Sequence, residues 1–140
     1  TIRRRFHRPG GAPLDGATFR QGETAIVCLE IICENPVRNL VVVDLLPGGL
    51  EIENPRLTGL VGPFEGEAVM PSYLDMRDER LVLVFDQLGA NAAGTAPHRF
   101  YYAVSAVTPG KYHYPPVEAE CMYDPAIRGA SESAMATVSP

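Results

Sequence analysis

The chain has 140 residues, of which 46% are hydrophobic, and a formal net charge of −5. This length fits one domain and allows a hydrophobic core without metals or several disulfides. The acidic balance argues against nucleic-acid binding, which needs a basic surface, and no apolar run reaches the 18 residues of a membrane span.

Thirteen prolines and 13 glycines favour short strands and turns over long helices. Alternation and turn signals predict strands at about 2–7, 24–34, 38–46, 49–53, 80–86, 99–107, 111–123 and 133–138. We therefore expect an all-β fold, an antiparallel β-sandwich of about 7–9 strands. At most one short helical turn is expected, at 88–93.

The first predicted strand carries the basic cluster Arg3-Arg4-Arg5, followed by Arg8. At strand spacing this cluster divides between two faces, which favours a charged, solvated edge strand. A contact with another domain is the alternative.

The strand at 24–34 has a regular core face made of Ala25, Val27, Leu29, Ile31 and Cys33. Its other face mixes isoleucines with Cys28 and glutamates, so we expect a loop or a neighbouring domain to cover it in part. The runs 40–46 and 81–85 are almost continuously apolar, as in central strands of a sandwich. Pro47-Gly48-Gly49 breaks the chain between strands, and 55–71 and 87–97 are predicted to be irregular.

The last third of the chain begins with the turn Thr108-Pro109-Gly110, where glycine supplies the positive φ of a type II turn. Alternation from 117 to 123 follows. It predicts a core face and an outer face, and the core face holds Val117, Ala119, Cys121 and Tyr123. Met122 then shares the outer face with two glutamates and is a large apolar side chain on a charged surface.

The three cysteines leave two possibilities open. Cys28 and Cys33 are five residues apart on one strand and face opposite sides, so they cannot pair. Cys33 shares core-face parity with Cys121, which makes a Cys33–Cys121 disulfide conceivable if their strands face one another. Buried free thiols are equally compatible with the pattern, because cysteine behaves as a small hydrophobic residue.

The sequence offers little for catalysis or metal binding. His7, His98 and His113 are isolated, and the chain contains no zinc, nucleophile-elbow or phosphate-loop motif. Four carboxylates could be imagined to form a calcium site, although charged residues flanking an apolar strand are the simpler interpretation. These carboxylates are Asp75, Asp78, Glu79 and Asp86. We predict a non-enzymatic domain without cofactor or metal.

Five segments, in order along the chain, carry a family resemblance. The longest is A-V-T-P-G-x-Y-x-x-P-P-x-E-x-E-x-M-Y-x-P-x-x-R at 106–128. The others are Gly11-Ala12-Pro13-Leu14 after Arg5-Phe6, Gln21-Gly22-Glu23 before a long strand, the D-L-L-P-G-G-L-E element at 44–51, and D-M-R-D-E-R at 75–80. Together they resemble the C-terminal macroglobulin-like domain (MG10 type) of bacterial α2-macroglobulins, which are broad-spectrum protease traps and endopeptidase inhibitors.

The resemblance implies a macroglobulin or fibronectin III-like sandwich over residues 1–140, excised from the C-terminal end of a much larger chain. It implies that Met122 and Tyr123 shield an internal Cys–Gln thioester of a separate domain until a protease cleaves the bait region. Asp124 and Pro125 would stiffen the supporting turn. The implied partners are other domains of the parent, chiefly the thioester domain, and target proteases through the whole parent. The implied location is the periplasm or cell envelope, without membrane insertion by this domain.

Parity sets a condition on this role. Met122 and Tyr123 point to opposite faces in a regular strand, so the strand must end or bulge at about Cys121 for both to reach one neighbour. Some bacterial relatives lack the thioester, and in those the domain would be a structural cap.

Two other classes of function stay open at this point. An immunoglobulin-like or fibronectin-like module for adhesion, carbohydrate binding or a structural role would need an exposed aromatic platform, for which Tyr101, Tyr112 and Tyr114 are candidates. Cross-strand pairing is the simpler role for these tyrosines. A cysteine-dependent enzyme would need a thiol with a lowered pKa.

Overall fold

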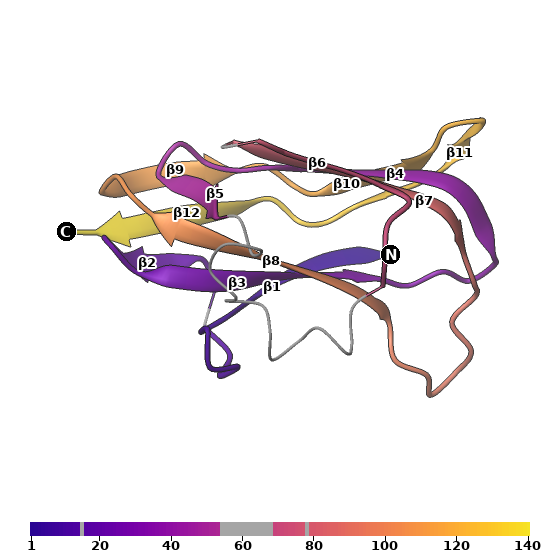
Figure 1. The fold of residues 1–140 in the computed structure, drawn as a ribbon, viewed down its shortest axis with the longest axis horizontal. Helices are drawn as coiled ribbons and strands as arrows, with labels where there is room; N and C mark the ends of the chain where they lie inside the picture. The colour runs from indigo at the N-terminus through magenta and orange to yellow at the C-terminus, as the bar shows by residue number, and fades with distance from the viewer. Residues whose placement is uncertain (15, 54–68, 78) are drawn as a thin grey trace.

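The computed structural model describes residues 1–14, 16–53, 69–77 and 79–140, which form twelve strands and no helix (Figure 1). The strands are β1 (Ile2–His7), β2 (Thr18–Arg20), β3 (Thr24–Ile31), β4 (Val37–Leu45), β5 (Leu50–Glu53), β6 (Tyr73–Arg77), β7 (Arg80–Leu88), β8 (His98–Ala106), β9 (Gly110–Tyr114), β10 (Glu118–Cys121), β11 (Asp124–Ala130) and β12 (Ala134–Ser139). No helix in this described part of the chain could cross a bilayer.

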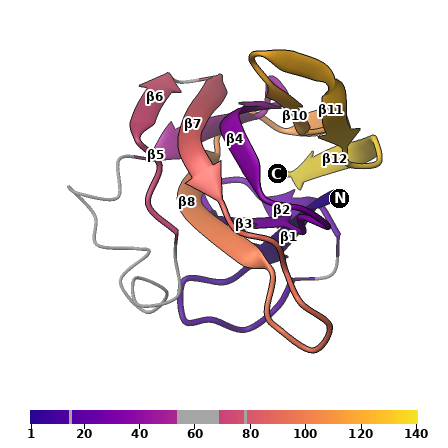
Figure 2. The same ribbon diagram turned by 90° about the vertical axis from the view of Figure 1, so that its right-hand side faces the viewer.

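The strands form a β-sandwich, as the sequence predicts. One layer is a four-stranded sheet in the order β1-β3-β8-β5, and the other is a five-stranded sheet in the order β11-β10-β4-β7-β6. Figure 2 shows these layers end-on. The third sheet, β2-β12-β9, contains a parallel pair, β2 with β12, so the fold is not purely antiparallel.

The core lies between the layers and follows the predicted alternation. Ala25, Val27, Leu29, Ile31 and Cys33 all belong to the main buried cluster. On the other face of β3, Ile26 and Cys28 are also buried, in a second cluster with Tyr101 and Ala103 of β8. The predicted covering of this face is confirmed. The runs at 40–46 and 81–85 contribute to β4 and β7, which are central strands.

The structure has more strands than the 7–9 predicted, for local reasons. The prolines at 115 and 116 divide the predicted strand 111–123 into β9 and β10, because proline cannot donate to a sheet ladder. The strand β2 has only three residues, with Phe19 alone buried, and the edge strands β6 and β11 are largely exposed and lack a regular apolar pattern. The predicted helical turn at 88–93 is absent, and β3 ends at Ile31 rather than at residue 34. Most of the predicted loop 55–71 lies outside the described residues.

The two predicted glycine turns meet at one tyrosine. The ring of Tyr112 lies so close to Gly49 that an added Cβ there would be 2.4 Å from Cε2 of the ring. Gly110 has a φ of 149°, and the Tyr112 hydroxyl donates to the carbonyl oxygens of Thr108 and Pro109. Tyr112 therefore joins the turns before β5 and β9.

A buried ion pair connects the two layers. Asp44 of β4 is fully buried and accepts hydrogen bonds from the Arg4 guanidinium of β1 and the Tyr102 hydroxyl of β8. Arg4 also donates to the Pro115 carbonyl at 2.7 Å, and its guanidinium carbon lies 3.9 Å from the centroid of the Tyr114 ring. The prediction that β1 is a charged edge strand is confirmed, but Arg4 points into the core rather than to solvent.

The outer side of the same edge carries a second charge cluster. Glu30 of β3, whose side chain is 5% exposed, accepts hydrogen bonds from Arg5 Nε at 2.7 Å and Arg99 Nε at 3.0 Å, with Arg3 at 3.9 Å. Burial raises the pKa of Glu30, but the hydrogen bond from Arg99 and the charge of Arg5 outweigh it and hold the pKa below its ordinary value. This cluster fastens β1 and β8 to β3.

We expect Arg4→Met to lower the free energy of unfolding by about 3–5 kcal/mol, because it leaves Asp44 charged and buried without its cation. Urea unfolding of the 140-residue chain measures this loss. The double variant Arg4→Met/Asp44→Leu is expected to recover most of it, since no unpaired charge remains. Equal losses in the single and double variants would show that charge pairing is not the cause.

The Glu30 cluster predicts a pH dependence. A carboxyl whose pKa is lowered in the folded state stabilises the fold above its unfolded pKa, about 4.3, and this contribution is lost as the pH falls through the folded pKa. Glu30→Gln is therefore expected to destabilise by about 1–3 kcal/mol at pH 7 and progressively less in acid. The control is Glu118→Gln, which removes an exposed carboxylate without an ion pair among the described residues. A pH-independent effect of Glu30→Gln would contradict the assignment.

Candidate functional site

The two residues predicted to form the site occupy the tip of a hairpin. Met122 and Tyr123 are the two turn residues between Cys121, the last residue of β10, and Asp124, the first residue of β11. In Figure 1 this hairpin lies at the upper right, at the end of the molecule opposite to the C-terminus. We call Met122 and Tyr123 the tip pair.

The predicted irregularity at Cys121 is present. Cys121 pairs with Asp124, whereas the preceding Glu120 pairs with Arg128, so three residues of β11 (125–127) have no partner on β10. The strand thus ends where the argument from parity requires. The two turn residues do not follow the strict alternation of a strand, so both side chains can contact the same neighbouring domain.

The tip pair is exposed and apolar. Met122 is 47% exposed and Tyr123 is 83% exposed. The sequence pattern placed Tyr123 on the core face with Val117, Ala119 and Cys121; the other three are buried, but Tyr123 is not. The reason is that the strand ends at Cys121. Asp124 and Pro125, predicted to stiffen the supporting turn, are exposed beside the tip but are the first two residues of β11 and not turn residues; their stiffening role stays a prediction.

The base of the hairpin is held by β4. Cys121 pairs with Leu40, and both side chains are buried. One residue further along, the Met122 N–H donates to the carbonyl oxygen of Asn39 at 2.9 Å. Asn39 has a φ of 54° and is the only non-glycine residue with a positive φ in the described ranges. Asn39 is not among the residues predicted from the sequence, although an asparagine within an apolar strand pattern was a signal.

The outer face of the five-stranded sheet is also unusual. Val41 and Val43 of β4 pair with Val84 and Val82 of β7, and all four side chains point away from the core and are only partly buried. Leu45 and Tyr73 extend this surface and are 43% and 58% exposed. We call these six residues the valine face. The continuous apolar runs at 40–46 and 81–85 were its signal, because a strand covered on one side only would alternate.

A hollow next to the valine face leads toward the hairpin. It has a volume of about 510 Å³ and is lined by Val41, Val43 and residues of β10 and β11. Glu118 and Glu120 lie opposite Val43 and Val41 on β10, and Arg128 lies opposite Glu120 on β11. The apolar surface is therefore flanked by carboxylates on the side of the hairpin.

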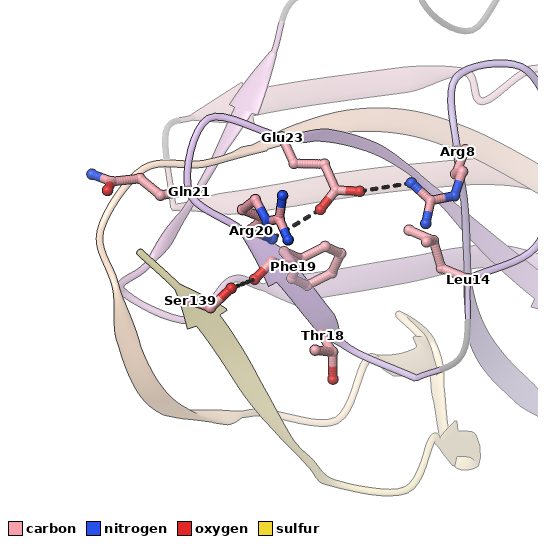
Figure 3. Close-up of a pocket in the computed structure, with 8 residues that line it drawn as sticks. All are labelled: Arg8, Leu14, Thr18, Phe19, Arg20, Gln21, Glu23 and Ser139. Atoms are coloured by element: carbon pink, nitrogen blue, oxygen red, sulfur yellow. Dashed lines mark hydrogen bonds and ion pairs between the residues drawn. The ribbon is translucent and has the colours of Figure 1, made fainter.

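A separate hollow of about 580 Å³ lies on the other side of the molecule (Figure 3). Several of its polar groups are engaged with one another: Glu23 accepts from Arg8 at 3.1 Å and from the Arg20 N–H at 2.8 Å, and Ser139 Oγ donates to the Phe19 carbonyl at 3.4 Å. These contacts fix the β2–β3 turn.

The cysteines do not match the requirement of a cysteine-dependent enzyme. All three are buried free thiols in the structure. Burial raises the pKa of Cys28 to about 11 and also raises the pKa values of Cys33 and Cys121, so thiolates are disfavoured at neutral pH. Of the two possibilities that parity left open, the structure contains free thiols rather than the Cys33–Cys121 disulfide.

The aromatic platform of the adhesion hypothesis is not formed. Tyr101 and Tyr114 are 7% and 0% exposed, and Tyr112 covers the glycine turns. For calcium, Asp78 lies outside the described residues, and among those described no group of three or more histidine, cysteine or acidic side chains could hold a metal. The candidate site with the clearest geometry is the hairpin and its surroundings.

Comparison with known proteins agrees with the fold and identifies the family. The family described as "Bacterial Alpha-2-macroglobulin MG10 domain" matches residues 1–126. An α2-macroglobulin of Xylella fastidiosa is 32% identical over 146 residues, covering 96% of this chain and 9% of that protein.

Two solved structures are similar over 99% of this chain. One is trypsin-activated α2-macroglobulin from Escherichia coli, with a TM-score of 0.85, 28% identity and 10% of that chain covered. The other is Salmonella α2-macroglobulin reacted with methylamine, with a TM-score of 0.80, 29% identity and 9% of that chain covered. The chain thus spans about a tenth of the length of these relatives, and it belongs to the MG10 domain family of the bacterial α2-macroglobulins.

Proposed function

We propose that this domain shields the thioester of a bacterial α2-macroglobulin, a broad-spectrum protease trap, by packing its tip pair against the thioester domain until the bait region is cleaved. The observation that carries the proposal is the hairpin itself. Met122 and Tyr123 are exposed at the end of the sandwich and form an apolar tip. Because they lie in a turn, they need not point to opposite faces as neighbours in a strand do.

The chemistry of a thioester explains why such a tip is useful. A thioester is an activated acyl donor, so its lifetime depends on keeping water and small nucleophiles away. Methionine adapts its shape to an irregular apolar site. Tyrosine adds a broad ring and a hydroxyl that can form a hydrogen bond with the partner. A short hairpin brings both side chains to one place without a large movement of the sandwich.

The valine face supports packing against another domain. Monomeric proteins seldom leave large contiguous apolar surfaces in water, and rims of polar residues are typical of interfaces. Most of the length of the relatives lies outside this chain, and the valine face continues along β4 toward the hairpin. Its occupant in the proposal is a domain of the parent chain with apolar side chains and with basic residues opposite Glu118 and Glu120.

A location in the periplasm or cell envelope stays a prediction. So does a direct encounter with proteases through the whole parent. Both depend on parts of the parent outside this chain. The similar Salmonella α2-macroglobulin was reacted with methylamine, and the experiments on thiol release below use the same reagent on the intact parent.

The tip pair predicts the rate at which methylamine releases free thiol from the full-length parent. Met122→Ala/Tyr123→Ala is expected to accelerate release at least about tenfold, because a loss of about 1.4 kcal/mol of shielding suffices for that factor. The matched control is Met135→Ala, which removes an exposed methionine of β12, in a different sheet. Thiol titration with a chromogenic disulfide reports the rate.

Equal and substantial release from wild type and double variant would reduce the domain to a structural cap. Absence of release from both would mean that the parent contains no working thioester, and the proposal would fall. Faster release from Met135→Ala as well would point to general destabilisation instead of shielding.

The valine face predicts protection of its side chains in the parent. In hydroxyl-radical footprinting, Leu45 and Tyr73 are expected to be oxidised several-fold more slowly in the intact parent than in the folded 140-residue chain, because an interdomain contact of typical size removes them from water. Met135 serves as the reference for a surface outside the face. If Leu45 and Tyr73 react equally fast in both proteins, the valine face is not covered.

A further inference from the structure

Asn39 combines three features that no other described residue shares. Its φ of 54° is unusual for a residue with a side chain. It lies inside β4, the strand that also carries Asp44 and the valine face. Its carbonyl oxygen accepts the N–H of Met122, the first residue of the tip pair, at 2.9 Å.

The distortion of β4 is confined to this residue. On one side Arg38 pairs with Gln87 of β7, and on the other side Leu40 pairs with Phe85, in a single register. Leu40 also pairs with Cys121 of β10 in regular fashion. The left-handed residue therefore does not correct a mismatch of register between β4 and its neighbours. It lies directly opposite the point where β10 ends and the turn begins.

A local backbone strain of this kind persists only when the surrounding structure enforces it, and it is common at functional positions. Asparagine tolerates the left-handed conformation better than other residues with a Cβ, whereas β-branched residues resist it strongly. The choice of residue thus matches the conformation. The conformation in turn determines where the carbonyl that receives the hairpin can point.

From this geometry we infer that Asn39 is a positioning residue for the tip pair: its left-handed backbone directs the carbonyl that holds Met122 and so sets the direction in which Met122 and Tyr123 leave the sandwich. The inference rests on the proposed shielding function. It adds a residue that does not touch the thioester itself and acts through the backbone of the hairpin.

The test uses the full-length parent and two substitutions that both remove the asparagine amide and differ in what they allow at the backbone. Asn39→Val retains the carbonyl but disfavours the positive φ. Asn39→Gly retains the carbonyl and the positive φ, because glycine adopts left-handed conformations readily. Asn39→Ala is a milder alternative if the valine variant does not fold. Each substitution is made in the wild type and in Met122→Ala/Tyr123→Ala.

Two quantities are measured, the rate of thiol release by methylamine and the hydrogen-exchange rate of the Met122 amide. We expect Asn39→Val to raise both rates about 5- to 30-fold in the wild-type background, which is the factor that corresponds to a loss of about 1–2 kcal/mol. Asn39→Gly should stay close to wild type. In the tip-pair double variant, Asn39→Val should no longer change thiol release, because the side chains that it positions are gone.

The outcomes separate the inference from the proposed function. If the double variant accelerates release but Asn39→Val does not, the shielding function stands and the role of Asn39 is wrong. If Asn39→Val accelerates release equally in both backgrounds, it acts through general stability and the inference is again wrong. If the double variant itself has no effect, the proposed function fails, and the role of Asn39 in shielding fails with it, even where Met122 exchange responds.

Discussion

The buried contact of Asp44 with Arg4 and Tyr102 is the interaction on which the arrangement of the two layers depends. A fully buried carboxylate is tolerated only where cations and hydroxyls meet it at defined positions. Because these partners come from β1 and β8, they favour a single position of the five-stranded sheet relative to the four-stranded sheet. Apolar side chains alone would permit small shifts between the layers, since hydrophobic contacts are not directional.

The same strand that carries Asp44 also connects the core with the hairpin. Along β4, Asp44 faces the core, Val41 and Val43 face outward, and Asn39 holds the turn of the hairpin. The buried ion pair therefore fixes β4 near one of its ends, and the hairpin is attached near the other. A well-packed strand as the support of the tip pair suits the proposed contact, in which both side chains occupy one place in a neighbouring domain.

The all-β fold, the central strands and the core face of β3 could be predicted because they follow from periodicity and turn residues. The tip pair followed from the family resemblance, and parity added the condition that the strand break near Cys121. The inward position of Arg4 could not be predicted, because its partner Asp44 is forty residues away in sequence and only the fold brings them together. Tyr123 was misplaced for a local reason, because strict alternation was extended two residues beyond Cys121, the end of the strand.

The three unpaired residues of β11 have a consequence for association between molecules. β11 is one of the two edge strands of the five-stranded sheet, and a regular edge next to an exposed apolar tip would invite another chain to add a strand. Pro125 lacks an N–H, and residues 125–127 leave the ladder out of step with β10. An incoming strand would find no continuous row of donors and acceptors along this edge. The apolar tip therefore lies beside an edge that is a poor template for the addition of a strand.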